Sequence, residues 1–360
     1  MKAKINSEMV ILAREYRGLK QKDLAEKLKV KQPQVAKLEA GLIGDAAEAM
    51  LPSLSCVLNF PEEFFLQSEM LVGFGSSSLY YRKRNKLSSS DRHRIHALVN
   101  LLRINLKTML NAVELAPTRK VPRMALEDNE QSPASVARAL RSFWRLPEGP
   151  IKNVTALMES AGIMIIPCDF GTKDMDGTGL WLNDMPPMIF INADLPGDRW
   201  RYTLLHELGH FVMHEVPYEA MEEEADDFAA EFLMPEVAMR AEFARIGAIR
   251  FQNLLTLKPY WKVAVSALIV RASELGFLSA HAAKGLWMAR GNAGGNSEPV
   301  FIDKEEVQNL PNILRYFREE MEFQEDDFRT FLKINPSELK FLYGISNEVA
   351  RPRARLRLVQ

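Results

Sequence analysis

The sequence predicts a mainly helical (α+β) protein with more than one domain. At roughly 150 residues per domain, a chain of 360 residues has the length of two or three domains. Apolar residues recur at helical spacing along most of the chain, whereas residues 163–192 contain short apolar runs separated by glycine and proline. The first pattern predicts helices, and the second predicts a small sheet that we expect to be antiparallel.

The N-terminal part predicts several short helices followed by a long one. Ser7 is placed to cap a helix that ends at Arg17, and two more helices are expected at about residues 20–28 and 32–39. Three short helices in succession are typical of a module that reads DNA. Residues 91–115 carry leucine, isoleucine and methionine at helical spacing, which predicts one long amphipathic helix.

The rest of the chain predicts the sheet, then helices again. Helices are expected from about residue 198 to 276, and the composition of residues 291–297, GNAGGNS, is that of a flexible linker. The last residues, RPRARLRLVQ, are compatible with either a basic arm or an edge strand. The three expected strands are Ile163–Pro167, Gly179–Leu182 and Met188–Asn192.

These elements group into four expected regions. Polar, proline-containing sequence at residues 117–133 marks a boundary before the part that holds the sheet. The regions are a small helical domain at 1–70, a helical linker region at 71–132, a domain with the sheet at 133–290, and a C-terminal helical region of unknown role at 298–360.

Composition favours a cytoplasmic protein with no membrane partner. The chain is 47% apolar and 26% charged, and its N-terminus lacks the apolar core and cleavage site of a signal peptide. No stretch approaches the roughly 20 apolar residues of a membrane span. Cys56 and Cys168 lie far apart and form no CxxC pair, which fits a reducing compartment and argues against zinc held by cysteine.

The net charge of −1 averages over three strongly charged blocks. Residues 1–44 hold ten Lys/Arg against five Asp/Glu, and residues 80–107 hold eight against one. Residues 215–242 hold ten Asp/Glu against a single arginine. The first two blocks fit a polyanionic partner such as DNA, and a bound cation would relieve the charge imbalance of the third.

The strongest motif is HELGH at residues 206–210, in a segment that Asp198 is placed to cap as a helix. Histidines four residues apart lie one turn apart on the same helix face, so His206 and His210 can both bind one metal ion. Glu207 follows the first ligand directly. It is placed to act as the catalytic base that takes a proton from the attacking water and passes it to the leaving amine.

A catalytic zinc needs a third protein ligand, and the acidic segment EEEADDFAA offers one. Glu222 begins this segment twelve residues after His210, and Asp226 lies one turn later on the same face. Ala225 and Ala229 would let the two helices approach closely. We therefore expect Glu222 as the third metal ligand and Asp226 as an acceptor for the free ring N–H of a ligand histidine.

Plainer interpretations of these residues also exist. The histidines could lie on a helix surface, and the acidic run could be a solvated face, as most such runs are. For His214, a structural role is weighed against stabilising an oxyanion or the substrate. The same ligand set also accepts manganese in place of zinc, because geometry and metal availability decide which ion binds.

The segments RWRYTLLHELGHFVMH and EEEADDFAAEFLMP resemble the ImmA/IrrE family of zinc metallo-endopeptidases, over about residues 150–275. The resemblance implies a gluzincin-like helical core beside a small sheet and the hydrolysis of a peptide bond. By analogy, His206, His210 and Glu222 match the metal ligands and Glu207 matches the catalytic base. Characterised relatives cleave repressors of the helix-turn-helix type.

The segment MVILAREYRGLKQKDLAEKLKVKQPQVAKLEAG resembles the XRE, or lambda-repressor-like, helix-turn-helix. The resemblance implies DNA binding, although any small three-helix bundle with lysine-rich faces would look similar. Pro33 is acceptable only in the first turn of the third helix. Core positions fall on Ala13, Leu24, Ala25, Val35 and Leu38; expected DNA contacts are Gln21 to phosphate, and Lys31, Gln32, Gln34 and Lys37 in the major groove.

Two functions follow from these motifs. The first is a zinc-dependent endopeptidase coupled to a DNA-binding domain, which cleaves a repressor or antitoxin-like protein in a stress, prophage or toxin-antitoxin context. The second is a sequence-specific transcriptional regulator whose metal site is structural or sensory. An edge strand of the sheet would bind an extended peptide, and Gly179–Asn183 and Met188–Asn192 are both candidates.

Two further interpretations concern assembly and self-cleavage. XRE modules usually act as dimers on paired half-sites, so we expect a homodimer. Arg82, Lys83 and Arg84 would serve as a dimer contact or as part of the phosphate-binding surface, or they are simply a solvated face. The chain could also cut its own linkers at 117–133 or 291–297.

Overall fold

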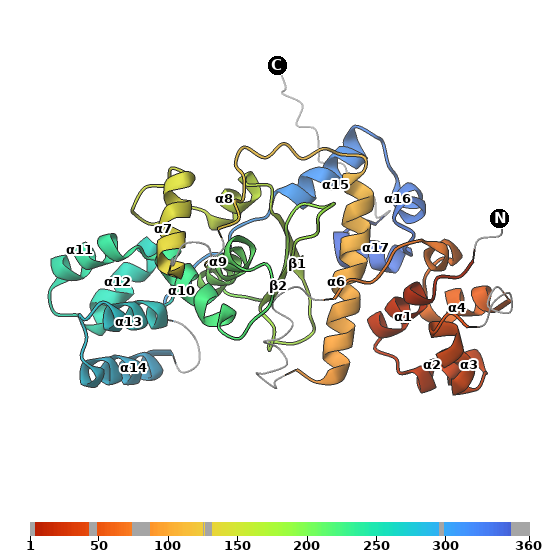
Figure 1. Cartoon of the computed structure of the whole chain (residues 1–360), viewed down its shortest axis with the longest axis horizontal. Helices are drawn as coiled ribbons and strands as arrows, with labels where there is room; N and C mark the ends of the chain where they lie inside the picture. Colours follow the sequence, from red (N-terminus) through yellow and green to blue (C-terminus); the bar gives the residue numbers. More distant parts are fainter. Residues whose placement is uncertain are drawn as a thin grey trace, which may run out of the picture. The chain divides into compact units, whose positions relative to one another are not determined.

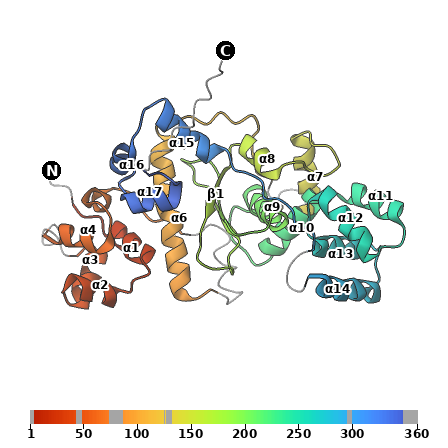
Figure 2. The same ribbon diagram turned by 180° about the vertical axis from the view of Figure 1, so that it is seen from behind.

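The computed structural model describes residues 4–42, 49–73, 87–124, 126, 132–294 and 299–346. The basic residues 82–84 and the C-terminal RPRARLRLVQ lie outside these ranges, so their expected roles stay predictions. The chain divides into two compact units (Figures 1 and 2). Unit 1 contains residues 1–72, 89–114 and 312–360, and unit 2 contains residues 73–88 and 115–311.

The described part of unit 1 consists of helices and loops. Its long helix runs from Ser89 to Leu110, close to the bounds that the apolar spacing predicts. The helices of this unit are α1 (Ser7–Tyr16), α2 (Gln21–Leu28), α3 (Gln32–Glu39), α4 (Leu51–Leu58), the 3-10 helix η2 (Glu62–Leu66), α6 (Ser89–Leu110), α16 (Glu325–Leu332), α17 (Pro336–Tyr343) and most of α15 (Asn309–Glu319).

The first three helices pack around the apolar side chains that the sequence places in their core. Asn6, and not Ser7, caps α1: the Asn6 side chain accepts a hydrogen bond of 3.0 Å from the backbone N–H of Glu8. Asn6 also donates to the carbonyl of Gln67, which fixes it at the start of the helix. The predicted core positions are all buried, namely Ala13, Leu24, Ala25, Val35 and Leu38.

The C-terminal helices belong to the same unit as these N-terminal helices. Arg17, which follows α1, forms an ion pair of 2.7 Å with the buried carboxylate of Glu338 in α17. Asn59, after α4, donates to the hydroxyl of Ser337 at 3.1 Å. Unit 1 is therefore built from three segments that are distant in the sequence.

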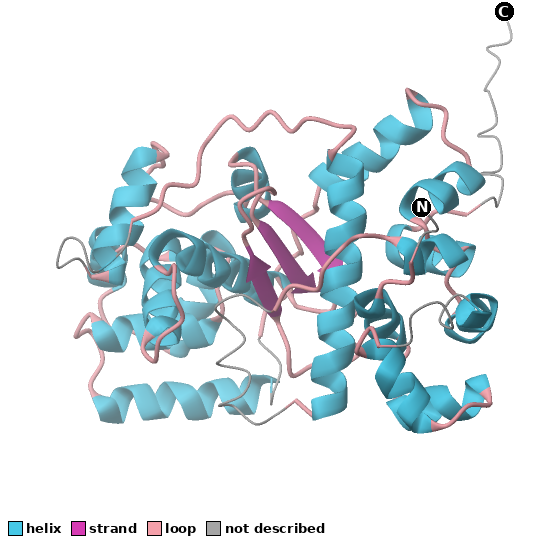
Figure 3. Cartoon of the chain, turned by 45° about the vertical axis from the view of Figure 1, so that its right-hand side comes forward, coloured by secondary structure: helices cyan, strands magenta, loops and turns pink. Residues whose placement is uncertain are grey.

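Unit 2 contains the small sheet, coloured magenta in Figure 3, and a group of helices. Among the described residues, all strands lie between residues 164 and 192, and helices precede and follow them. The elements are α7 (Pro133–Phe143), α8 (Val154–Ser160), β1 (Met164–Cys168), β2 (Gly177–Leu180), β3 (Met188–Asn192), α9 (Gly197–Met213), α10 (Met221–Leu233), α11 (Glu236–Ile246), α12 (Phe251–Trp261), α13 (Val265–Glu274) and α14 (Ala280–Gly294).

The sheet has the strand order β1-β3-β2 and is mixed. β2 and β3 pair antiparallel, with Gly179 opposite Ile189, whereas β1 and β3 pair parallel, with Ile165 opposite Ile189. The expectation of a wholly antiparallel sheet was therefore wrong. Short apolar runs reveal strands, but strand direction depends on which strand pairs with which, and here β3 inserts between β1 and β2.

The central position of β3 also limits where a peptide can bind. Both edges of β3 are occupied by its neighbours, so Met188–Asn192 is wrong as a candidate for binding an added strand. β2 is an edge of the sheet, and β1 is the other. Of the two candidate segments, only the one that overlaps β2 lies at a sheet edge.

Helix α9 packs between this sheet and α10. Leu204, Leu205 and Leu208 of α9 are fully buried, in the same apolar core as Ile189 and Ile191 of β3. On its other side, Gly209 lets α10 approach: a Cβ at Gly209 would lie 3.1 Å from a ring carbon of Phe228 and 3.4 Å from Cα of Ala225. This packing buries Ala225 and Ala229, as the sequence predicted.

The start of α9 differs from expectation. The helix begins at Gly197 after Pro196, and no side chain caps its first turn. Asp198 lies inside the helix, where its buried carboxylate forms an ion pair with the ammonium of Lys258 in α12. Asp198 therefore anchors α9 to α12 instead of capping it, because a buried lysine requires an opposite charge.

Within the part of the chain that the structure describes, no helix combines the length and apolarity needed to cross a membrane.

Candidate metal centre

Helix α9 places His206 and His210 on the same face, one turn apart. Their ring centroids are 4.8 Å apart, and the two Nε2 atoms face each other at 3.1 Å. Both residues lie in the middle of a helix that is buried on nearly every side, so packing fixes the direction of both rings. The spacing of the motif thus brings two imidazole nitrogens to one point.

Glu222, in the first turn of α10, brings a carboxylate to the same point. One of its oxygens, Oε2, lies 3.2 Å from Nε2 of His206, and the other, Oε1, lies 3.5 Å from Nε2 of His210. The ligand atoms of these residues all lie within 4.8 Å of one another, which makes them a group able to hold a metal ion. The structure therefore brings together the three residues that the sequence proposed as ligands.

The distances between the three ligand atoms fit a cation with tetrahedral coordination. Zinc–ligand distances of about 2.0 to 2.2 Å at tetrahedral angles place neighbouring ligand atoms about 3.3 Å apart, close to the distances of 3.1, 3.2 and 3.5 Å in this chain. Oε1 of Glu222 is buried and has no hydrogen-bond donor among the described residues. A buried carboxylate oxygen of this kind is costly unless a positive partner satisfies it.

Asp226 holds the ring of His206. Oδ1 of Asp226 lies 2.8 Å from Nδ1 of His206 and accepts a hydrogen bond of 3.0 Å from the hydroxyl of Tyr202. When Nδ1 of His206 donates to this carboxylate, Nε2 carries the lone pair and points at the shared site. Asp226 therefore lies where the sequence placed it, and Tyr202 extends the contact.

His210 has a different support, which the sequence did not reveal. Its Nδ1 lies 2.9 Å from Nδ1 of His214, and Nε2 of His214 lies 3.0 Å from Oε2 of Glu224. Burial and the nearby His210 lower the pKa of His214 to about 4, so the ring is neutral at pH 7. A neutral His214 that donates to Glu224 must accept at Nδ1, which leaves Nε2 of His210 free for a metal ion.

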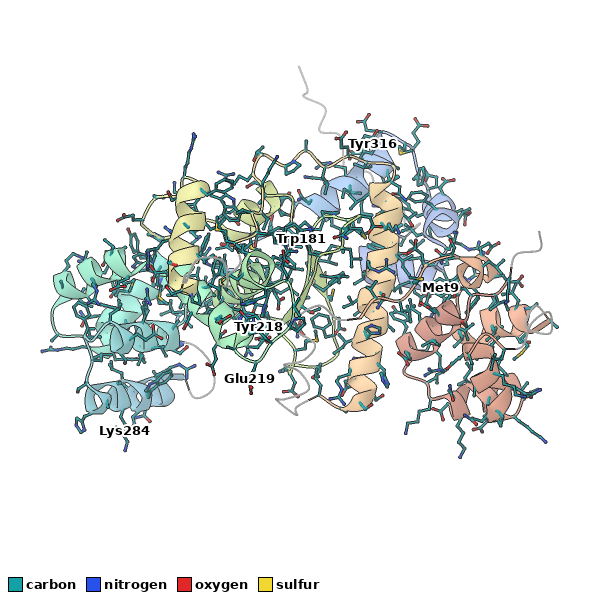
Figure 4. All side chains as sticks on the ribbon, viewed as in Figure 1. Met9, Trp181, Tyr218, Glu219, Lys284 and Tyr316 are labelled. Atoms are coloured by element: carbon teal, nitrogen blue, oxygen red, sulfur yellow. The ribbon has the colours of Figure 1, made fainter. Side chains whose placement is uncertain are left out.

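The loop between α9 and α10 completes this chain of contacts. The hydroxyl of Tyr218, which is labelled in Figure 4, donates to the same oxygen of Glu224. The ring of Tyr218 also packs edge-on against His214, with centroids 5.4 Å apart. These contacts agree with the structural role considered for His214, because His214 orients the ring of His210.

The charges of the site favour a cation. Burial lowers the pKa of His206, but hydrogen bonds to Asp226 and Glu222 outweigh burial and raise it to about 10. Burial raises the pKa of Glu222, but contacts with His206 and His210 outweigh burial and lower it to about 2. The surrounding carboxylates therefore favour positive charge at the point where the three ligand atoms meet.

Glu207 points from α9 toward the edge strand β2. Its carboxylate accepts a hydrogen bond from the backbone N–H of Gly179, and burial raises its pKa above the ordinary value for glutamate. Gly179 has no room for a side chain, because a Cβ there would lie 2.9 Å from Oε2 of Glu207 and 2.8 Å from the ring of Phe211. A buried carboxylate with a raised pKa is suited to accept and return a proton.

Aromatic side chains border this side of the site. The ring of Trp181, which follows β2 and is labelled in Figure 4, packs edge-on against Phe211 with centroids 5.8 Å apart. The guanidinium of Arg123 lies 3.9 Å from the centroid of the Trp181 ring and donates to the carbonyl of Phe211 at 2.6 Å. These contacts tie β2 to the C-terminal half of α9.

In unit 1, four of the five expected DNA-contacting residues are exposed, and Gln21 is not. Gln21 is half-buried: it donates to Glu39 at 2.8 Å and accepts from Gln32 at 2.9 Å, so it orients the start of α3. Gln34 accepts from the backbone N–H of Lys31 at 3.0 Å. Pro33 lies in the first turn of α3, where it is tolerated. The exposed candidates are Lys31, Gln32, Gln34 and Lys37.

Fold and site together define a class of protein in which a helix-turn-helix unit and a metallopeptidase-type domain share one chain. Comparison with known families supports both domains. Residues 11–65 match the helix-turn-helix family, and residues 158–273 match the IrrE N-terminal-like domain, a peptidase family. The chain carries an XRE-type helix-turn-helix domain and an IrrE-like peptidase domain. A search of curated proteins finds no match to the chain.

The two matches carry the coarse functional assignments. A helix-turn-helix domain indicates DNA as a partner, and a peptidase domain indicates a protein substrate. Membership of a metallopeptidase family implies a divalent metal, for which the group around Glu222 is the candidate site.

Proposed function

We propose that this protein is a zinc-dependent endopeptidase coupled to a DNA-binding domain. The observation that carries the proposal is the convergence of the three ligand atoms beside Glu207, which lies next to a sheet edge. A metal site with two histidines and a glutamate leaves a position open for chemistry, and zinc is the usual ion in such a site. Manganese fits the same ligands.

In this proposal, His206, His210 and Glu222 would hold the ion, while Asp226 and His214 keep both Nε2 lone pairs directed at it. When bound, the ion would supply a Lewis acid that polarises the scissile carbonyl and activates water. Glu207 would take a proton from the attacking water on a carboxylate oxygen and return it to the leaving amine nitrogen. Its burial beside Gly179 keeps that carboxylate oriented.

The substrate would lie along β2 as an added strand. Gly177–Leu180 is the sheet edge that contacts α9 at Glu207 and Phe211, so a chain paired with it would pass the catalytic base. Main-chain pairing of this kind binds many sequences, and selectivity then depends on pockets for side chains.

The DNA-binding part of the proposal rests on the exposed face of α3. Lys31 and Lys37 would neutralise phosphates, while Gln32 and Gln34 would contact base edges in the major groove. Gln21 would donate to phosphate as well as orient Gln32. A homodimer would present two such helices to paired half-sites.

The proposed substrate is a regulatory protein, a helix-turn-helix repressor or an antitoxin-like protein, in a stress, prophage or toxin-antitoxin setting. This part is supported by the resemblance of residues 150–275 to the ImmA/IrrE family and by the fusion to a DNA-binding domain. A peptidase on the same chain as a DNA-binding domain would meet its substrate at the operator.

The alternative is a transcriptional regulator whose metal site is structural or sensory. A Glu207→Gln variant separates the two functions, because it removes the proton acceptor and keeps every metal ligand. Peptide cleavage is assayed with a quenched-fluorescence peptide library, alongside metal content and operator binding. The endopeptidase predicts lost cleavage with metal and DNA binding retained. No cleavage by the metal-loaded wild type would favour the regulator, and equal cleavage by the wild type and the variant would exclude Glu207 as the catalytic base.

A further inference from the structure

A cavity of about 720 Å³ lies in unit 2, directly beside the metal centre. It is bordered by α9, α10, α13, Arg290 of α14 and residues 300–302. Tyr202 lines it from α9, one helical turn before the ligand His206, and Asp226 lines it from α10. Asp226 also bonds to Nδ1 of His206, so one carboxylate contacts both the cavity and the metal-binding ring.

The wall of the cavity is mainly apolar. Leu233 at the end of α10, Met234 directly after it and Val263 before α13 are buried. Val270 at the rim is 45% exposed, and Phe301 is 75% exposed. A space of this size and character holds more than one amino-acid side chain. Removing apolar surface of a bound chain from water is favourable here by about 25 cal/mol per Å².

The carboxylates that line the cavity are paired, with one exception. The carboxylate of Asp227, on α10, is exposed and makes no hydrogen bond or ion pair within the described ranges. The other charged side chains of the lining have partners: Asp198 with Lys258, Arg199 with Asp176, Asp226 with His206, Arg271 with Glu231 and Glu274, and Arg290 with the ring of Trp287.

The local potential at Asp227 is negative. Burial and the neighbouring carboxylates of Asp226 and Glu223 raise the pKa of Asp227, and the guanidinium of Arg271 offsets only part of this effect. Three acidic residues close together on one helix repel one another, and a cationic group placed between them would relieve that repulsion. The cavity therefore combines an apolar wall with one acidic end.

We propose that this cavity binds the part of the substrate that flanks the scissile bond, and that it selects an arginine or lysine next to apolar residues. The inference rests on the proposed endopeptidase function. The cavity begins one helical turn from His206, it has room for more than one side chain, and the carboxylate of Asp227 in its lining has no ion-pair partner among the described residues. To occupy this cavity, a peptide held at β2 would extend across α9 past His206.

The first test measures peptide binding without cleavage. Acetylated tripeptide amides Leu-Arg-Leu, Leu-Gln-Leu and Leu-Glu-Leu are titrated by calorimetry into the full-length Glu207→Gln chain. We expect the arginine peptide to bind about tenfold more tightly than the glutamate peptide, with the glutamine peptide between them. The reason is that the carboxylate of Asp227 attracts the arginine side chain and repels the glutamate side chain. Equal affinity for all three peptides would overturn the inference.

Two variants locate the binding. Asp227→Lys reverses the order of the three affinities, whereas Glu148→Lys, an exposed acid of the same unit outside the cavity lining, leaves the order unchanged. Ala267→Trp fills the cavity and weakens all three peptides at least about tenfold. Circular dichroism checks that each variant is folded, and Val270→Trp at the rim replaces Ala267→Trp if the latter unfolds.

Failure of this inference and failure of the proposed function are distinguishable. Calorimetry on the Glu207→Gln chain does not depend on cleavage. The order of the three peptide affinities therefore tests the cavity inference independently of peptidase activity. If the metal-loaded wild type cuts peptides but shows no preference for arginine in binding, only the cavity inference is wrong. If the charge order holds but no peptide is cut, the cavity binds cationic peptides and the endopeptidase function is wrong.

Discussion

The Nδ1 atoms of His210 and His214 lie 2.9 Å apart, and this contact makes one histidine ring the support of another. His214 passes the contact on to Glu224 through Nε2 at 3.0 Å. His206, in contrast, bonds directly to the carboxylate of Asp226. The two histidines of the HELGH motif are thus held by different groups. A carboxylate holds His206, and the buried, neutral ring of His214 holds His210.

Replacing His214 by alanine is expected to weaken metal binding about 10- to 100-fold, because Nδ1 of His210 loses the acceptor that fixes its tautomer. Competition with a metal-binding dye measures the affinity. His281→Ala, which removes an exposed histidine of α14, should leave the affinity unchanged. The same affinity in His214→Ala and the wild type would show that the His214–Glu224 contact does not support the metal site.

Metal removal should lower stability, since a ligand that binds only the folded chain stabilises it by about 2.7 kcal/mol at a hundredfold excess over Kd. We expect about one metal ion per wild-type chain and a lower melting temperature after treatment with a chelator. Glu222→Ala removes the third ligand, so it should contain no metal and show no response to chelator. Elemental analysis and thermal melts check both statements, and a full metal complement in Glu222→Ala would exclude Glu222 as a ligand.

Gly179→Ala is expected to destabilise unit 2 by about 1 to 3 kcal/mol, because the added methyl group would meet Phe211 at 2.8 Å and Glu207 at 2.9 Å. Urea unfolding measures the free energy, and the variant should also lose peptide cleavage because Glu207 is displaced. Gly149→Ala is the matched control: a Cβ there meets no atom within 4 Å. Equal destabilisation by both substitutions would contradict the tight contact at β2.

Lys37→Ala should weaken binding to DNA of any sequence and reduce the slope of log affinity against log salt by about 1, as expected for one lost phosphate contact. Fluorescence anisotropy over a series of salt concentrations measures the slope. Lys284→Ala removes an exposed lysine from α14 in unit 2 and should leave the slope unchanged. A loss of affinity confined to one operator would instead assign Lys37 to base recognition.

The two cysteines should differ in reactivity. Cys168 is buried in β1, and burial raises the pKa of its thiol, so its thiolate fraction at pH 8 is far below that of an exposed cysteine. Cys56 is exposed. We expect a disulfide reagent to label one thiol per folded chain at pH 8 and two in denaturant, and Cys56→Ser to abolish the fast reaction. Rapid labelling of Cys168 in the folded chain would show that β1 opens readily.

The sequence by itself determined the features that depend on local spacing. The i,i+4 histidines fix two ligand directions on any helix, and the period of apolar residues fixes the helix α9 that carries them. The pattern of α10 located Glu222 and Asp226 on one face, and the small side chains of Ala225 and Ala229 indicated close helix packing. The helix-turn-helix module was predictable for the same reason, because its helices are short and their core positions are periodic.

Only the tertiary structure decided the features that depend on how elements cross. The support of His210 by His214 and Glu224 needs the crossing of α9 and α10 and the loop at Tyr218, and no residue spacing encodes that distance. The parallel direction of β1 and the central place of β3 likewise depend on pairing between distant residues, such as Met164 with Met188. The ion pair between Arg17 and Glu338 joins segments that are distant in the sequence, and so do the walls of the cavity beside Asp227. A single sequence carries no periodic signal for such contacts.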